Sequence, residues 1–152
     1  MVIRAYCGMV CVVLITMCVP QIMSANLKNF DQKKYDIALK LNNHPSFTRG
    51  KVDFFVCYTP ASFLFGAFTL PSIYPNTVFL SPSIIDDPYL DANIAHELGH
   101  LQFRHGYFGN AEITQSEADT FAANIVGKER MINLRLSMGF TEDHYLIRNL
   151  KK

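Results

Sequence analysis

The sequence predicts an α+β domain, in which a short antiparallel or mixed sheet packs on a helix around residue 96 and on the helix that follows it. Three observations support this fold class. Apolar runs rich in β-branched and aromatic residues gather between residues 51 and 81, and helical periodicity follows from residue 86 onward. The 152 residues leave room for one domain, and 49% hydrophobic with 18% charged residues is typical of a folded globular chain.

The first 25 residues differ from the rest of the chain. After Arg4 no charged side chain occurs until Lys28, and residues 5–19 are almost continuously apolar. Such a run is short for a membrane-spanning helix and typical of the apolar part of a secretory signal. We therefore expect a signal peptide or N-terminal membrane anchor over 1–25 and a single domain over 26–152. The protein is then exported (periplasmic or secreted) or anchored to a membrane, facing outside the cytoplasm.

Charge and cysteine content narrow the range of partners. The net charge is +1, and no basic run extends beyond Lys33-Lys34 and Lys151-Lys152, so nucleic acid is not an expected partner. Of the four cysteines only Cys57 lies outside the leader, which rules out a disulfide within the domain. Cys57 stands in an apolar run, where the role of a small buried side chain is expected.

The first part of the domain reads as one helix followed by strands. Apolar residues recur at helical spacing over 29–41, ahead of the turn at Asn42-Asn43-His44-Pro45. Strands are predicted over 51–59, 63–70 and 76–81, the last bounded by Pro75 and Pro82.

A longer helix is expected next. Asp86-Asp87-Pro88 is a typical helix start, and Gly106 marks an end after His105. One apolar stripe of this helix faces the core and consists of Leu90, Ile94, Leu98 and Leu101. At about 100° per residue, His96 and His100 lie roughly 200 to 240° round from the centre of that stripe, toward a cleft. Small residues form a third face where another helix can approach closely: Ala92, Ala95 and Gly99.

The motif His96-Glu97-Leu98-Gly99-His100 carries the chemistry. Two histidines four residues apart share a helical face at a spacing that suits one tetrahedral Zn²⁺. Glu97 can reach a water on that metal as general base. A catalytic zinc needs a third protein ligand. A third histidine six residues after the second is one known arrangement, but that position is Gly106 here. We therefore expect a carboxylate from the following helix to be the third ligand. That helix is predicted to begin at Thr114 or Ser116.

The motif, His105, Glu117-Ala118-Asp119 and Phe121-Ala122 together resemble the small gluzincin metallopeptidases that include HtpX and the CAAX prenyl endopeptidases. ImmA-like peptidases, usually cytosolic, share a similar pattern. The resemblance covers residues 60 to 127. It implies a zincin-like fold and a zinc-dependent endopeptidase acting on exported or envelope proteins. A polypeptide substrate would lie extended along an edge strand, here Val78-Phe79-Leu80-Ser81.

The chain departs from this family at the third ligand. The family commonly has Glu four residues before the Asp, where this chain has the neutral Gln115. Glu117 can serve if the helix begins late and residues 115–117 form an irregular entry. Glu112 is the alternative, and an incomplete site is the third. Asp119 is expected to fix a ligating histidine by accepting its other N–H.

These alternatives leave two further functional hypotheses open. One is a catalytically inactive metal-binding or interaction protein of the cell envelope, which Gln115 motivates. The other is a cytosolic regulatory protease of the ImmA-like kind. Oxyanion donors for a peptidase are sought among His105, His144 and Tyr145, all downstream of the motif.

Overall fold

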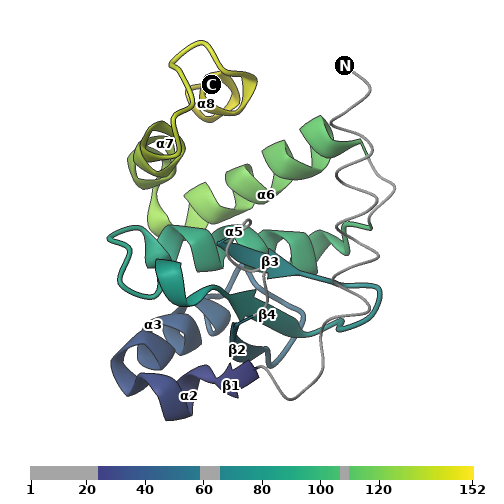
Figure 1. The fold of residues 1–152 in the computed structure, drawn as a ribbon. Helices are drawn as coiled ribbons and strands as arrows, with labels where there is room; N and C mark the ends of the chain where they lie inside the picture. Colours follow the sequence, from purple (N-terminus) through teal and green to yellow (C-terminus); the bar gives the residue numbers. More distant parts are fainter. Residues whose placement is uncertain (1–23, 59–65, 107–109) are drawn as a thin grey trace.

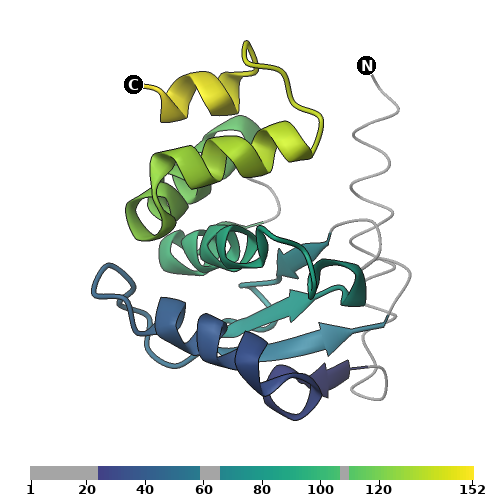
Figure 2. The same ribbon diagram turned by 90° about the vertical axis from the view of Figure 1, so that its left-hand side faces the viewer.

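The computed structural model describes residues 24–58, 66–106 and 110–152. It has a mixed sheet and helices in one α+β arrangement, which confirms the predicted fold class. The helix α5 (Leu90–Phe103) lies between the sheet on one side and α6 (Ala111–Val126), α7 (Lys128–Ser137) and α8 (Tyr145–Leu150) on the other (Figure 1, Figure 2). The motif helix is therefore central to the molecule.

The sheet consists of β1 (Ser24–Asn26), β2 (Asp53–Cys57), β3 (Ala67–Thr69) and β4 (Thr77–Leu80), in the order β1-β2-β4-β3. β2 and β4 are parallel, and the two outer pairings are antiparallel. The strands predicted over 51–59 and 76–81 are confirmed. Of the strand predicted over 63–70, residues 67–69 are extended, and 63–65 lie outside the described residues. β1 was not predicted, because it falls where the leader was expected to end.

The predicted substrate edge at Val78-Phe79-Leu80-Ser81 is wrong. β4 pairs with β2 on one side and with β3 on the other, so its backbone groups are already used in the sheet. The edge next to the motif helix is β3, because the chain turns back after β3 and places β4 inside the sheet. Sheet order depends on long-range pairing, which the local pattern of residues 76–81 does not contain.

The helix predicted over 29–41 is divided in two at Asp31. The short helix α2 (Leu27–Phe30) comes first, and α3 (Gln32–Asn42) follows. The Asp31 side chain accepts a hydrogen bond from the Lys34 backbone N–H at 3.1 Å and caps α3. After β4, a short 3₁₀ helix, η2 (Pro82–Ile84), leads toward the motif helix.

The motif helix is shorter than predicted at both ends. The Asp87 carboxylate accepts from the Tyr89 N–H at 2.6 Å and closes a turn ahead of the helix, so α5 begins only at Leu90. At the other end Arg104 adopts a left-handed conformation, with φ 54°, and ends the helix before Gly106. The central turns, which carry the motif, are regular as predicted.

Alternate residues of the sheet pack against the predicted stripe of α5. Phe54, Val56, Val78 and Leu80 face this core, and all four residues of the stripe are buried in it. On the small-residue face, a Cβ added to Gly99 would lie 2.8 Å from the Ala118 Cα, so α6 packs directly on α5 there. The predicted close approach of a second helix is confirmed.

The helix α6 begins earlier than predicted, because Asn110 caps it. Its side-chain oxygen accepts from the N–H groups of Glu112 at 2.9 Å and Ile113 at 3.4 Å. The expected caps, Thr114 and Ser116, lie inside regular helix. No helix in the described residues is long and apolar enough to cross a membrane. The predicted leader over 1–25 lies almost entirely outside the described residues.

Candidate metal site

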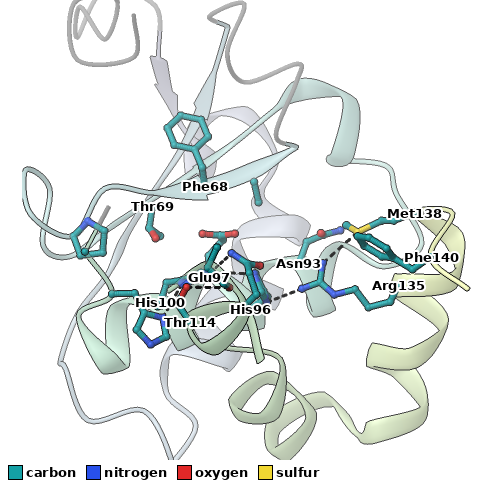
Figure 3. Close-up of a pocket in the computed structure, with 16 residues that line it drawn as sticks. Phe68, Thr69, Asn93, His96, Glu97, His100, Thr114, Arg135, Met138 and Phe140 are labelled. Atoms are coloured by element: carbon teal, nitrogen blue, oxygen red, sulfur yellow. Dashed lines mark hydrogen bonds between the residues drawn. The ribbon is translucent and has the colours of Figure 1, made fainter. Parts of the chain in front are cut away.

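Three side chains of the motif lie together in the middle of α5. Ligating atoms of His96, Glu97 and His100 all lie within 4.8 Å of one another. His96 and Glu97 are buried, and His100 is half-buried. Together they line a cavity of about 490 Å³ that also touches β3 and α6 (Figure 3). The predicted cleft next to the histidines is present.

His96 is held by a buried ion pair. Its Nδ1 lies 2.7 Å from Asp119 Oδ1, which is the contact predicted for Asp119. Arg135 from α7 donates from Nε to Asp119 Oδ2 at 2.9 Å and from Nη2 to Oδ1. Arg135 Nη2 also lies 3.0 Å from His96 Nδ1, so the carboxylate lies between donors from two helices. Arg135 was not predicted as a site residue, and its one signal in the sequence is a basic residue inside the apolar pattern of α7.

These contacts determine which nitrogen of His96 carries the proton. Burial alone would raise the pKa of Asp119, but the hydrogen bonds from His96 and Arg135 lower it below the ordinary value of 3.8. Asp119 is therefore ionised and can only accept, so His96 Nδ1 carries the hydrogen. With the hydrogen on Nδ1, the other nitrogen, Nε2, is the one that can offer a lone pair, and it lies 3.0 Å from His100 Nε2.

His100 has its own supporting chain, made by His105 and Glu117. His105 Nε2 lies 3.0 Å from Glu117 Oε2, and His105 Nδ1 lies 2.8 Å from His100 Nδ1. When the His105 ring carries one hydrogen, on the Nε2 that faces the Glu117 carboxylate, its Nδ1 is an acceptor and takes the hydrogen of His100 Nδ1. Burial first, and then His96 and His105, lower the pKa of His100 to about 2, so its ring is neutral. His100 Nε2 is thereby left with a lone pair.

The hydrogen bonds on the two sides of the site place the Nε2 atoms of His96 and His100 opposite each other. His96 Nε2 and His100 Nε2 are 3.0 Å apart. The tautomers inferred from the hydrogen bonds at the two Nδ1 atoms place no hydrogen on either Nε2. Two facing acceptors repel each other, and a cation that accepts both lone pairs removes that repulsion. The donor set therefore fits a metal ion, and this buried group can hold one.

Glu97 lies in the same group and faces β3. Burial raises the pKa of Glu97 above the ordinary value of 4.5, while His96, hydrogen bonds from the Thr69 hydroxyl and backbone N–H, and Arg135 act in the opposite direction. Figure 3 shows the Glu97 carboxylate between Thr69 and the two histidines. A carboxylate with a raised pKa beside a metal site is suited to taking up a proton.

Neither Glu117 nor Glu112, the two carboxylates expected as alternatives for the third ligand, contacts the histidines, whereas Gln115 does. The amide Nε2 of Gln115 lies 3.3 Å from His100 Nε2. Glu117 contacts His105 instead and its side chain is 52% exposed. Glu112 is exposed and does not line the cavity.

The irregular helix entry that would have brought Glu117 inward is wrong. Because α6 is regular from Ala111, Glu117 lies roughly 200° round the helix from Asp119. Of the expected oxyanion donors, His105 supports His100 and also lines the cavity, whereas the His144 side chain caps α8 at Leu146 N–H.

Comparisons of the chain with protein-family models, with curated proteins and with solved structures gave no match. The site therefore rests on its own geometry. What that geometry establishes is a buried His96-Glu97-His100 group that can hold a metal ion, supported on each side by a hydrogen-bonded carboxylate.

Proposed function

We propose that this protein is a zinc-dependent metalloendopeptidase, with His96 and His100 as metal ligands and Glu97 as general base. The observation that carries the proposal is the pair of Nε2 atoms 3.0 Å apart in one buried group with the Glu97 carboxylate. Imidazole nitrogen at a four-residue helical spacing is a donor set that zinc favours. The resemblance to gluzincins supports the same choice of ion and reaction.

The chain's own residues account for the proton transfers of peptide hydrolysis. A bound zinc ion supplies Lewis acidity, polarising a peptide carbonyl and lowering the pKa of a water. Glu97 takes a proton from the attacking water and passes it to the leaving amine. Its raised pKa favours the uptake, and Thr69 holds the carboxylate in place. Asp119 and His105 keep the two ligating rings in the required tautomer.

The strand β3 is the proposed docking edge for an extended polypeptide substrate. Ala67, Phe68 and Thr69 line the cavity, and β3 is the outer strand of the described sheet on that side. An extended segment can add to such an edge through backbone hydrogen bonds. This replaces Val78-Phe79-Leu80-Ser81 as the proposed substrate edge.

The test compares Glu97→Gln with the wild type on an unfolded substrate such as casein. We expect Glu97→Gln to lose cleavage while still binding one zinc ion per chain. Glu129→Gln, an exposed glutamate on α7, is the matched control and should cleave normally. Cleavage that survives in Glu97→Gln removes Glu97 from the reaction.

A second candidate function is a metal-binding protein of the cell envelope without peptidase activity. It is favoured by Gln115, which lies beside His100 where the peptidases that the motif resembles carry a carboxylate. Zinc bound at one ion per chain, with no turnover of a broad peptide library, would favour it.

Export or membrane anchoring through residues 1–25 is part of both proposals, and sequencing the mature N-terminus tests it. An N-terminus intact at Met1 in a soluble fraction favours a cytosolic, ImmA-like regulatory protease.

A further inference from the structure

We propose that the side-chain carbonyl of Gln115 is the third protein donor to the metal, so that the ligand set is two imidazoles and one neutral amide. This inference rests on the proposed metal site and specifies its composition. It assigns Glu117 a different task, which is to hold His105.

The packing of the two helices places Gln115 at the site. His96 contacts Asp119, and His100, one turn later on α5, contacts Gln115, one turn earlier on α6. The helices therefore run antiparallel, and the step of four residues on one matches the step of four on the other. Gly99 fixes this register, because only a residue without a side chain lets the Ala118 backbone approach so closely.

The amide group of Gln115 can present either a donor or an acceptor. In the described arrangement its Nε2 donates toward the lone pair of His100 Nε2 at 3.3 Å. A metal ion takes that lone pair, which removes the acceptor for the amide N–H. Rotating the amide group by about 180° then presents Oε1 to the cation, and the side chain still fills the same space.

The carboxylates nearby are otherwise engaged. Glu117 accepts from His105 Nε2 and is half exposed, so moving it to the metal would break the chain that supports His100. Glu97 belongs to the buried group but accepts hydrogen bonds from Thr69 of β3. Glu112 lies outside the cavity lining.

A neutral third donor has a chemical consequence. Two imidazoles and an amide carry no charge, so the ligands leave the charge of a divalent ion uncompensated. Glu97 is the carboxylate that shares the buried group with the two histidines. Such a site holds zinc less tightly than one with a carboxylate ligand. It also favours an anionic group in its open position.

Zinc affinity of the full chain, measured by competition with a chromophoric chelator, tests the assignment. We expect Gln115→Leu to weaken binding by roughly tenfold or more, because even an outer partner of a ligand is worth about that much. We expect Gln115→Glu to tighten binding by roughly tenfold or more, since a charged donor replaces a neutral one. Gln32→Leu, at the start of α3, is the matched control and should leave affinity unchanged.

The rival ligands give opposite results. Glu117→Gln keeps an acceptor for His105, so we expect an affinity within roughly threefold of the wild type, whereas a ligating Glu117 would lose far more. Loss of affinity in Glu117→Gln or Glu97→Gln, with none in Gln115→Leu, overturns the assignment. Absence of zinc binding in the wild type instead overturns the metal site itself. Circular dichroism of each metal-free variant separates misfolding from ligand loss, and tightening in Gln115→Glu cannot arise from misfolding.

Discussion

The two histidines of the site receive the same support from two different kinds of surroundings. On the His96 side, Asp119 and Arg135 are almost fully buried, with side chains 1% and 7% exposed. On the His100 side, the chain through His105 ends at Glu117, which is 52% exposed. Both chains fix a tautomer, but only the first is also an ion pair in the interior. Substitutions on the His96 side, which we call the buried side, should therefore change folding stability. Substitutions on the His100 side, the open side, should change metal affinity alone.

The largest effect is expected from Asp119→Ala, which leaves the Arg135 charge buried without its partner. We predict a loss of about 3–5 kcal/mol in the free energy of unfolding, measured by urea denaturation. Asp143→Ala, an exposed carboxylate between α7 and α8, should cost almost nothing. If Asp119→Ala and Asp143→Ala lose the same free energy of unfolding, the buried ion pair does not stabilise the fold.

The stability contributed by Asp119 should depend on pH. The pKa of Asp119 is lower in the folded chain than its ordinary value of 3.8. The stability that Asp119 contributes is therefore fully present above pH 3.8, and it is lost as the pH falls toward and through the pKa of the folded chain. The difference between wild type and Asp119→Ala should therefore shrink in acid. Replacing both partners, in Asp119→Leu with Arg135→Met, should recover part of the loss.

Gly99→Ala should weaken both sides of the site at once. The added Cβ would meet the Ala118 Cα at 2.8 Å and its carbonyl oxygen at 3.0 Å, and both belong to backbone that cannot rotate away. We predict a loss of about 1–3 kcal/mol in stability together with weaker zinc binding. Gly106→Ala, where an added Cβ meets nothing within 4 Å, is the control. Equal effects of the two substitutions would mean that helix separation does not matter.

Glu97→Gln should stabilise the metal-free chain. Because burial raises the pKa of Glu97, the unfolded chain gives up this proton at lower pH than the folded chain does. The advantage of the neutral variant should therefore grow as the pH rises above 4.5 and level off above the raised pKa. Thermal unfolding of both proteins in a chelating buffer measures it. A variant less stable than wild type at every pH contradicts the burial cost.

The smallest effect on stability is expected on the open side. His105→Leu should change the free energy of unfolding by about 0.5 kcal/mol, yet lower zinc affinity roughly tenfold, because His100 loses the acceptor of its Nδ1–H. His105→Gln offers an acceptor again and should recover affinity. A stability loss as large as that of Asp119→Ala would erase the distinction between the two sides.

The sequence predicted those features of the site that depend on one helix. His96, Glu97 and His100 follow from local spacing, and the apolar stripe and the small-residue face of α5 follow from the same periodicity. Asp119 was also identified, because its role needs only a second helix nearby.

Features that depend on long-range packing were not predicted correctly. Arg135 comes from α7, and no local pattern reveals which face of α7 meets α6. The placement of Glu117 failed for a smaller reason, since Asn110 competed with Thr114 and Ser116 as the cap and moved the helix start. The order of β3 and β4 likewise depends on pairing between distant segments.

The central claim is that the lone pairs of His96 and His100 form one metal site. Calorimetric titration of zinc into the metal-free full chain tests it most directly, with His96→Leu and His100→Leu beside the wild type and His44→Leu, a histidine outside the site, as control. We predict one ion per wild-type chain, the same for His44→Leu, and loss of binding in either site variant. A wild type that binds no zinc, or site variants that bind it as tightly as the wild type does, would contradict the claim.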